Sequence, residues 1–217
     1  MMYSRSISEC PYNNIKDGFK TVMIDKTGNK KINDGFDKSR DLVSFSAKYN
    51  ENKDLLIKIT LEKYQPEAFE EDSSIVILLD FLKDYGSYLL PFNVKGATDH
   101  WWEIAYNIKN KNVTHQISED IPYTESNQRE VLKQFLEVLE TNQETNEITL
   151  KLNINKLKEL GWCPRFPLYL QILTTKGEII TDSFNDPKPY ENSNFLVGAM
   201  PINKFLEYNS KCLVISH

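Results

Sequence analysis

Residues 25–62, DKTGNKKINDGFDKSRDLVSFSAKYNENKDLLIKITLE, contain the pattern that decides the fold. An acidic segment with two glycines leads into VSFSAKY, and a short polar turn separates that sequence from LLIKITL. Apolar and polar side chains alternate in both sequences, as they do in a strand that buries one face. The pattern predicts two neighbouring strands, at 43–49 and 55–61.

The same reading extends the sheet in both directions. Residues 74–81, SIVILLDF, are apolar without alternation, which is typical of a central strand that is covered on both faces. In WWEIAYNI, residues 101–108, alternation places Trp102 on the face of Ile104 and Tyr106, and Trp101 with Glu103 on the other. Further strands are predicted at 19–25, 113–118, 146–153, 166–174, 177–181, 196–202 and 213–215.

Helices are predicted at only two places. Residues 128–140, QREVLKQFLEVLE, carry apolar side chains at helical spacing, which favours a helix over at least the first half. Residues 154–160 form a short helix that ends at Gly161, a residue suited to the position after a helix. Many short strands with one or two short helices predict a mainly β protein, a single antiparallel β-sandwich of the jelly-roll type.

Length and composition fit one domain. The chain has 217 residues, of which 40% are hydrophobic, enough for a packed core. Residues 1–18 are polar and predict a loosely ordered lead-in, and no repeat or linker divides residues 19–217. The net charge of −5 argues against a nucleic-acid-binding surface. No apolar run approaches the roughly 20 residues that span a bilayer, and the first residues lack the apolar core of a signal peptide.

The three cysteines match neither a zinc motif nor a disulfide framework. Cys10, Cys163 and Cys212 are widely spaced, which favours buried or unreactive thiols over a single Cys10–Cys212 bridge.

The acidic segment is a candidate calcium site. Calcium takes six to eight oxygen ligands from carboxylates, amides and carbonyls, and a glycine-containing loop can wrap around it. The spacing is not that of an EF-hand, and ordinary turns use the same residue types, so turn chemistry is the alternative. The candidate ligands are Asp25, Asn29, Asp34, Asp37 and Asp41, with Asn33 between them.

An aromatic cluster is the candidate ligand-binding site. Sugar rings present a face of C–H bonds, so glycan sites need flat aromatic side chains with polar groups beside them. Trp102 is assigned to the core, and Trp101 to a solvent-facing platform. The other candidates are two loop tyrosines and the polar neighbours of Trp101, namely Tyr85, Tyr88, Asp99, His100 and Glu103.

Motifs of enzymes are absent from the sequence. There is no GxSxG, HExxH, GxxxxGK[ST] or GxGxxG. His100 and His115 have no third ligand at metal spacing. Glu103 with Asp80 or Asp99 forms a carboxylate pair of the kind glycosidases use, but an acidic chain offers many such pairs. We therefore expect a protein without catalytic activity.

The segment 25–62 resembles the β-sandwich modules at the C-termini of glucodextranases, which are similar to DOMON-like and family 9 carbohydrate-binding modules. Those modules have a D-x-x-G-(D/N) loop before an alternating strand. The residues that carry the resemblance are Asp25, Gly28, Asn29, Asp37, Asp41, Leu42, Phe45, Ala47 and Tyr49, followed by Leu55, Ile57 and Ile59.

The resemblance continues in scattered positions to Asp182. SIVILLDF with Asp80 is similar to a strand that closes on an aspartate, and Trp102–Glu103 to a Trp-(D/E) pair after a Pro and a Gly. The sequence LKELGWCPRFPLYLQILTT is similar to a late short helix followed by a strand. Asn29 departs from the pattern, because an acidic residue is expected there, and the aromatic binding residues of those modules have no matched position.

The resemblance implies a non-catalytic module that binds a glycan or accompanies a glycan-active protein, outside the cell or in the cell envelope, with calcium as a structural ion. The alternative is a structural or protein-interaction domain of an envelope assembly. A hydrolase that uses a pair such as Asp80 and Glu103 ranks last.

Overall fold

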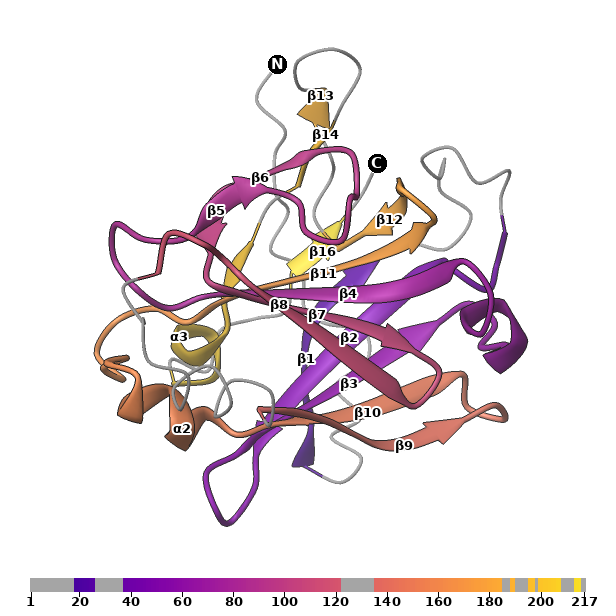
Figure 1. Cartoon of the computed structure of the whole chain (residues 1–217). Coiled ribbons are helices and arrows are strands. Elements are labelled where there is room, and N and C mark those ends of the chain that lie inside the picture. The colour runs from indigo at the N-terminus through magenta and orange to yellow at the C-terminus, as the bar shows by residue number, and fades with distance from the viewer. Residues whose placement is uncertain are drawn as a thin grey trace.

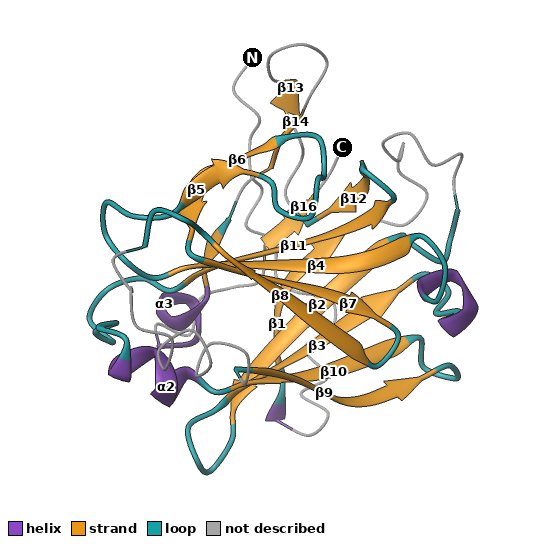
Figure 2. Ribbon diagram, viewed as in Figure 1, coloured by secondary structure: helices purple, strands orange, loops and turns teal. Residues whose placement is uncertain are grey.

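A computed structural model of the chain describes residues 18–25, 37–121, 135–184, 188–189, 195–197, 199–207 and 213–215. Strands dominate these residues, and the few short helices lie at the periphery (Figure 2). The prediction of a mainly β protein with a sandwich architecture is confirmed. The predicted lead-in lies outside the described residues, apart from Gly18.

The first sheet is built around the two strands that the alternating pattern predicts. β2 and β3 pair antiparallel, with Tyr49 opposite Leu55 across the polar turn. Asn50 closes that turn, because its side-chain oxygen accepts from the Asp54 N–H at 2.8 Å. The sheet has the order β16-β1-β2-β3-β10-β9. Its strands are β1 (Lys20–Asp25), β2 (Leu42–Tyr49), β3 (Leu55–Leu61), β9 (Leu136–Asn142), β10 (Glu147–Leu152) and β16 (Leu213–Ile215).

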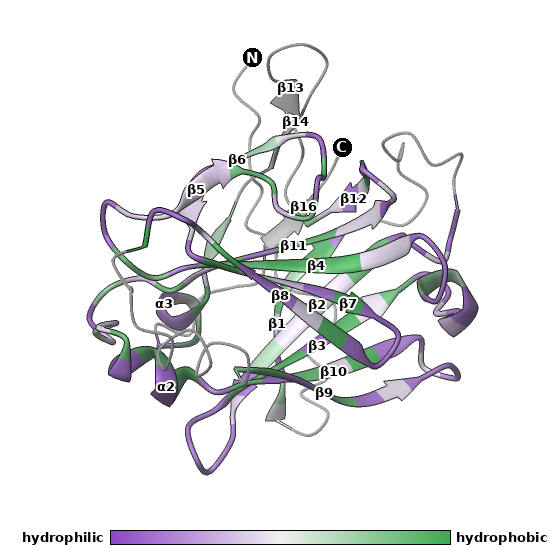
Figure 3. Cartoon of the chain, in the orientation of Figure 1, coloured by the Kyte–Doolittle hydropathy of each residue, from purple (hydrophilic) through white to green (hydrophobic). Residues whose placement is uncertain are grey.

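The second sheet has β4 at its centre and the order β12-β11-β4-β7-β8. β4 is buried at every residue except the last, Asp80, which confirms a strand covered on both faces (Figure 3). The short strand β15 (Met200–Pro201) pairs with β11 at this sheet. The other strands are β4 (Ser73–Asp80), β7 (Ile104–Lys109), β8 (Asn112–Ile117), β11 (Tyr169–Lys176) and β12 (Ile179–Ser183).

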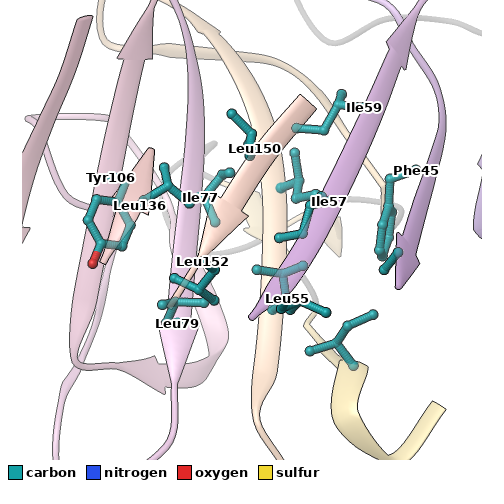
Figure 4. Packing of buried hydrophobic residues seen from close by; sticks show 14 of the residues in the cluster. Phe45, Leu55, Ile57, Ile59, Ile77, Leu79, Tyr106, Leu136, Leu150 and Leu152 are labelled. Atoms are coloured by element: carbon teal, nitrogen blue, oxygen red, sulfur yellow. The ribbon is translucent and has the colours of Figure 1, made fainter. Parts of the chain in front are cut away.

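The main core lies between the first two sheets. Ile77 and Leu79 of β4 point toward Leu150 and Leu152 of β10, and all four side chains are buried (Figure 4). Phe45 of β2 extends the same cluster. Burial of this interdigitated apolar layer is the dominant favourable term in folding a sandwich.

A third, smaller sheet covers the opposite face of the second sheet, and a second core fills the space between them. The order is β13-β14-β6-β5. Val76 and Leu78, the alternate side chains of β4, pack there with Trp102. Figure 1 shows β5 and β6 of the third sheet above β4 and β11. We call residues 82–102, which contain β5 and β6, the β5–β6 layer. The strands are β5 (Ser87–Leu89), β6 (Ala97–Trp102), β13 (Lys188–Pro189) and β14 (Phe195–Val197).

One predicted strand is in fact two strands. β6 ends at Trp102 and β7 begins at Ile104, so the chain passes from the third sheet to the second at Glu103. The face assignment for 101–108 is therefore wrong, because Trp102 packs in the second core and not beside Ile104. Burial of Trp102, which is 2% exposed, is confirmed.

The helix predicted over at least the first half of 128–140 does not continue into the second half, where β9 begins at Leu136 and pairs with β10. Residues 128–134 lie outside the described residues. The helix at 154–160 is confirmed as α2 (Ile154–Glu159), and Gly161 follows it with φ of 96°. The predicted strand at 196–202 overlaps β14 and contains β15, and α3 (Ile202–Glu207) begins at its last residue.

The remaining helix of the described residues is a single 3-10 turn, η2 (Pro66–Phe69). None of the helices in these ranges is long and apolar enough to cross a membrane.

Candidate functional site

A pocket of about 590 Å³ lies where the second and third sheets meet. One side is formed by the end of β4 and the start of β11, and the other by β6. The loop after β4 and the loop before β11 complete its rim. The pocket therefore lies between elements that are far apart in sequence, and the third sheet is required to form it.

The sheet pairing positions the floor of the pocket. Asp80, the last residue of β4, is opposite Tyr169, the first residue of β11. The His100 ring stacks on the Tyr169 ring with centroids 3.9 Å apart and an interplanar angle of 22°. His100 Nδ1 lies 3.2 Å from Asp80 Oδ2. The histidine is thus held by one neighbour through its ring face and by another through its nitrogen.

The Asp80 carboxylate also changes the protonation of His100. The hydrogen bond to Asp80 is the main cause that raises the pKa of His100, partial burial opposes it, and the charge of Asp99 adds to it. The imidazolium form is therefore favoured in the folded protein relative to a free histidine. The imidazolium has a second N–H donor, at Nε2, besides the Nδ1–H that faces Asp80.

Aromatic rings stand around this polar floor. Trp101 is 52% exposed and Phe166 is 61% exposed, and both line the pocket together with Tyr85. Single exposed rings are common on protein surfaces, but several gathered around one pocket are typical of an interaction site. Gly86 allows the Tyr85 loop to lie close against β6. A Cβ at this position would lie only 2.7 Å from the carbonyl oxygens of Trp101 and Trp102.

Glu103 lies behind the pocket and not in it. Its side chain is fully buried, Oε2 accepts from the Phe81 N–H at 2.7 Å, and Oε1 has no hydrogen-bond partner. Burial raises the pKa of Glu103 to about 9, and the charge of Asp80 adds to the rise. The side chain is therefore neutral at pH 7, and it supports the loop that follows β4.

The structure brings together most of the side chains that the sequence singled out. Tyr85, Asp99, His100 and Trp101 line one pocket. Tyr88, which is 47% exposed, belongs to β5 but does not line the pocket, and neither does Glu103. The assignment of Glu103 as a ligand contact is therefore corrected, because its carboxyl group is buried under the loop after β4.

Sequence reasoning missed Phe166 and Tyr169 and the pairing of Asp80 with His100. The sequence pattern predicts a strand at 166–174 that includes Phe166, whereas β11 begins only at Tyr169. The useful signal is the aromatic residue before Pro167, because a proline at the start of a strand marks a loop boundary.

A second pocket, of about 600 Å³, lies at the turn between β7 and β8. Its side chains include Phe69, Asn107 and Asn110, but Phe69 is only 1% exposed and offers no flat surface to a ligand. Asn110 donates to Glu70 at 3.2 Å. This pocket lacks the exposed rings of the first.

The predicted calcium ligands are only partly described. Asp37 accepts from the Ser39 N–H at 2.9 Å and its other oxygen lies 2.9 Å from Arg40, so it serves a turn. Asp25 and Asp41 are buried close to the buried Asp182. Burial is the main cause that raises the pKa of Asp182 well above its usual value, and the charges of Asp25 and Asp41 raise it further. Among the described residues, no group of three or more His, Cys, Asp or Glu side chains is placed to hold a metal ion.

The described part of the segment therefore does not by itself fit a calcium site, and Asn29 and Asp34 lie outside the described residues. Calcium binding stays a prediction. It predicts that excess calcium raises the melting temperature relative to a sample in EDTA, because a ligand that binds only the native state stabilises it. The measurement is a thermal melt by circular dichroism. Identical melting temperatures would mean that the acidic residues of the segment serve ordinary turns and do not bind calcium.

The cysteine among the described residues adds no site. Cys163 is a free, partly buried thiol. Cys10 and Cys212, and hence the alternative bridge between them, lie outside the described residues.

No protein-family model matches the chain, and a search of curated proteins finds no match either.

Proposed function

We propose that the chain is a non-catalytic module that binds a glycan in the pocket between the second and third sheets. The observation that carries this proposal is the half-exposed Trp101 ring beside the fixed Asp80–His100 pair. The ring offers an apolar face to the C–H side of a sugar, and the pair offers hydrogen bonds to its hydroxyl groups.

Two further features support a saccharide ligand. Phe166 and Tyr85 add aromatic surface on the rim, so more than one sugar face or unit finds a contact. His100 is held by Tyr169 and Asp80 before any ligand arrives, which lowers the entropy cost of binding. A module of this kind fits a location outside the cell or in the cell envelope, next to a glycan-active protein.

The second candidate is a protein-interaction domain. It is favoured by exposed apolar side chains of β5, an edge strand of the third sheet, where Tyr88 is 47% and Leu89 is 54% exposed. An exposed strand edge can pair with a strand of another chain.

Trp101→Ala separates the two candidates. We expect it to weaken glycan binding at least about thirtyfold, since a central aromatic contact contributes about 2 kcal/mol or more. Its free energy of unfolding should stay close to that of the wild type, because Trp101 is half exposed. The measurement is a glycan array followed by titration calorimetry with the best ligand.

Tyr88→Ala is the matched control, because this ring is similarly exposed but lies outside the pocket. It should bind glycans like the wild type. If a glycan binds equally well to the Trp101 variant, or if no glycan binds at all, the proposal fails. A partner protein that binds the Trp101→Ala variant but no longer binds the Tyr88→Ala variant would instead establish the interaction domain.

A further inference from the structure

The charges of the pocket are mostly matched in pairs. Lys83 and Asp84 lie 4.0 Å apart on the rim, with side chains more than three-quarters exposed. His100 and Asp80 form the pair on the floor. Asp99 is the remaining carboxylate among the described residues that line the pocket. Its charge acts on the neighbouring His100, but it forms no direct ion pair with the lysine or the histidine there.

The Asp99 carboxylate is held in place on the binding face. Its Oδ1 accepts from the Ala199 N–H at 3.1 Å, and the side chain is exposed to solvent. Asp99 and Trp101 are two residues apart on β6, and both line the same pocket. A carboxylate next to an exposed indole is suited to an ammonium group, which both attract.

We propose that the glycan recognised by this pocket carries a protonated amine, so that its sugar class is an amino sugar rather than a neutral or acidic one. This inference rests on the proposed function. The amine lies between the Asp99 carboxylate and the Trp101 ring, while the hydroxyl groups of the same unit reach the Asp80–His100 pair. An N-acetylated sugar is neutral and offers no positive charge to the Asp99 carboxylate. The carboxylate of a uronic acid is repelled by the carboxylate of Asp99.

The absence of a suitable partner for an acidic sugar points in the same direction. Recognition of a carboxylate commonly uses the guanidinium fork of arginine. None of the described residues that line the pocket is an arginine, and the lysine there, Lys83, already faces Asp84. The protonated His100 ring and the Asp80 carboxylate beside it carry no net charge together, so the pair gives an acidic sugar no net attraction.

The test is titration calorimetry with four probes of equal length, at a pH below the pKa of the amine. The probes are oligomers of glucosamine, N-acetylglucosamine, galacturonic acid and lysine. We expect the glucosamine oligomer to bind roughly tenfold more tightly than the N-acetylated one, a difference of about 1.4 kcal/mol. The preference should shrink at high salt, since it is electrostatic.

Asp99→Asn is the decisive variant, because the amide oxygen can still accept from Ala199 while the charge is lost. It should bind both glucosamine and N-acetylglucosamine oligomers with similar, weaker affinity. Asp120→Asn removes an exposed charge outside the pocket and should keep the tenfold preference.

Each other outcome overturns the inference. Equal affinity for the amine and its N-acetyl form in the wild type, or a preference that survives in Asp99→Asn, would show that Asp99 does not select an amine. Lysine oligomers that bind as well as glucosamine would show attraction of any cation. In these cases Trp101-dependent binding of a sugar would leave the proposed function standing, whereas no binding of any sugar would remove both.

Discussion

Trp102→Ala should lower the free energy of unfolding by about 3–5 kcal/mol, the usual cost of removing a buried aromatic side chain. Trp102 is 2% exposed and fills the second core against Val76 and Leu78. Its indole N–H also donates to the Leu89 carbonyl at 2.7 Å, so the substitution releases β5 from β6 as well. The measurement is urea unfolding, followed by fluorescence and by circular dichroism.

The neighbouring residue supplies the control for this prediction. Trp101→Ala removes a side chain of the same size, but one that is 52% exposed, and we expect a change below about 1 kcal/mol. Trp102→Phe keeps most of the apolar volume and loses the hydrogen bond, so its effect should lie between the two. Equal destabilisation by Trp101→Ala and Trp102→Ala would contradict the assignment of one ring to the pocket and the other to the second core.

Glu103 should make the protein less stable as the pH rises. Its pKa is about 9 in the folded protein, against an ordinary value of 4.5, because the carboxyl group is buried. Between these values the folded state holds a proton that the unfolded state has released. The stabilisation from this proton is complete below about pH 4.5 and is lost progressively up to about pH 9, with a slope of up to about 1.4 kcal/mol per pH unit.

Glu103→Gln should remove this slope. The amide oxygen can accept from the Phe81 N–H as Oε2 does now, and its NH2 group takes the place of the unpartnered Oε1. If the NH2 group of the glutamine has no partner, the resulting loss of stability is the same at every pH. It lowers the free energy of unfolding uniformly and leaves its slope against pH unchanged. The measurement is the free energy of unfolding in urea from pH 5 to pH 9.

The free energy of unfolding of the wild type minus that of Glu103→Gln should fall steadily from pH 5 to pH 9. The contributions of all other titrating groups cancel in this difference. Glu144→Gln, at an exposed glutamate in the turn between β9 and β10, should give a curve parallel to that of the wild type. Parallel curves for the wild type and Glu103→Gln would mean that the buried carboxyl group is charged in the folded protein.

The elements predicted best from the sequence are those whose pattern is set by one buried face. Alternation between 43 and 61 gave β2, β3 and their turn, and the uninterrupted apolar run gave β4, whose odd and even side chains enter different cores. In these strands the local pattern and the tertiary environment agree.

The errors have physical causes that a single sequence does not contain. The residues around Phe135 and Leu136 have helical spacing, but pairing of Leu136 with Leu152 of β10 places them in a strand. At Glu103 the alternation continues unbroken in sequence, although the chain changes sheets there. Period-two patterns report burial on one face, and they do not report which sheet provides it.

The candidate site was predictable in composition but not in geometry. The cluster of Asp99, His100 and Trp101 is visible in the sequence, and so is the loop tyrosine Tyr85. The contribution of Phe166 and Tyr169 depends on β11 lying beside β4, a pairing of residues about ninety positions apart that local pattern does not specify.

The separation of the two cores has a consequence for affinity. The β5–β6 layer, which carries Trp101, packs on a smaller cluster than the main core, so we expect it to open at a lower free energy than the rest of the sandwich. Only the closed population presents a complete pocket, and the apparent dissociation constant rises in inverse proportion to that population. Substitutions in the second core should therefore weaken the proposed glycan binding without contacting the ligand, and amide exchange of β6 would report the closed population directly.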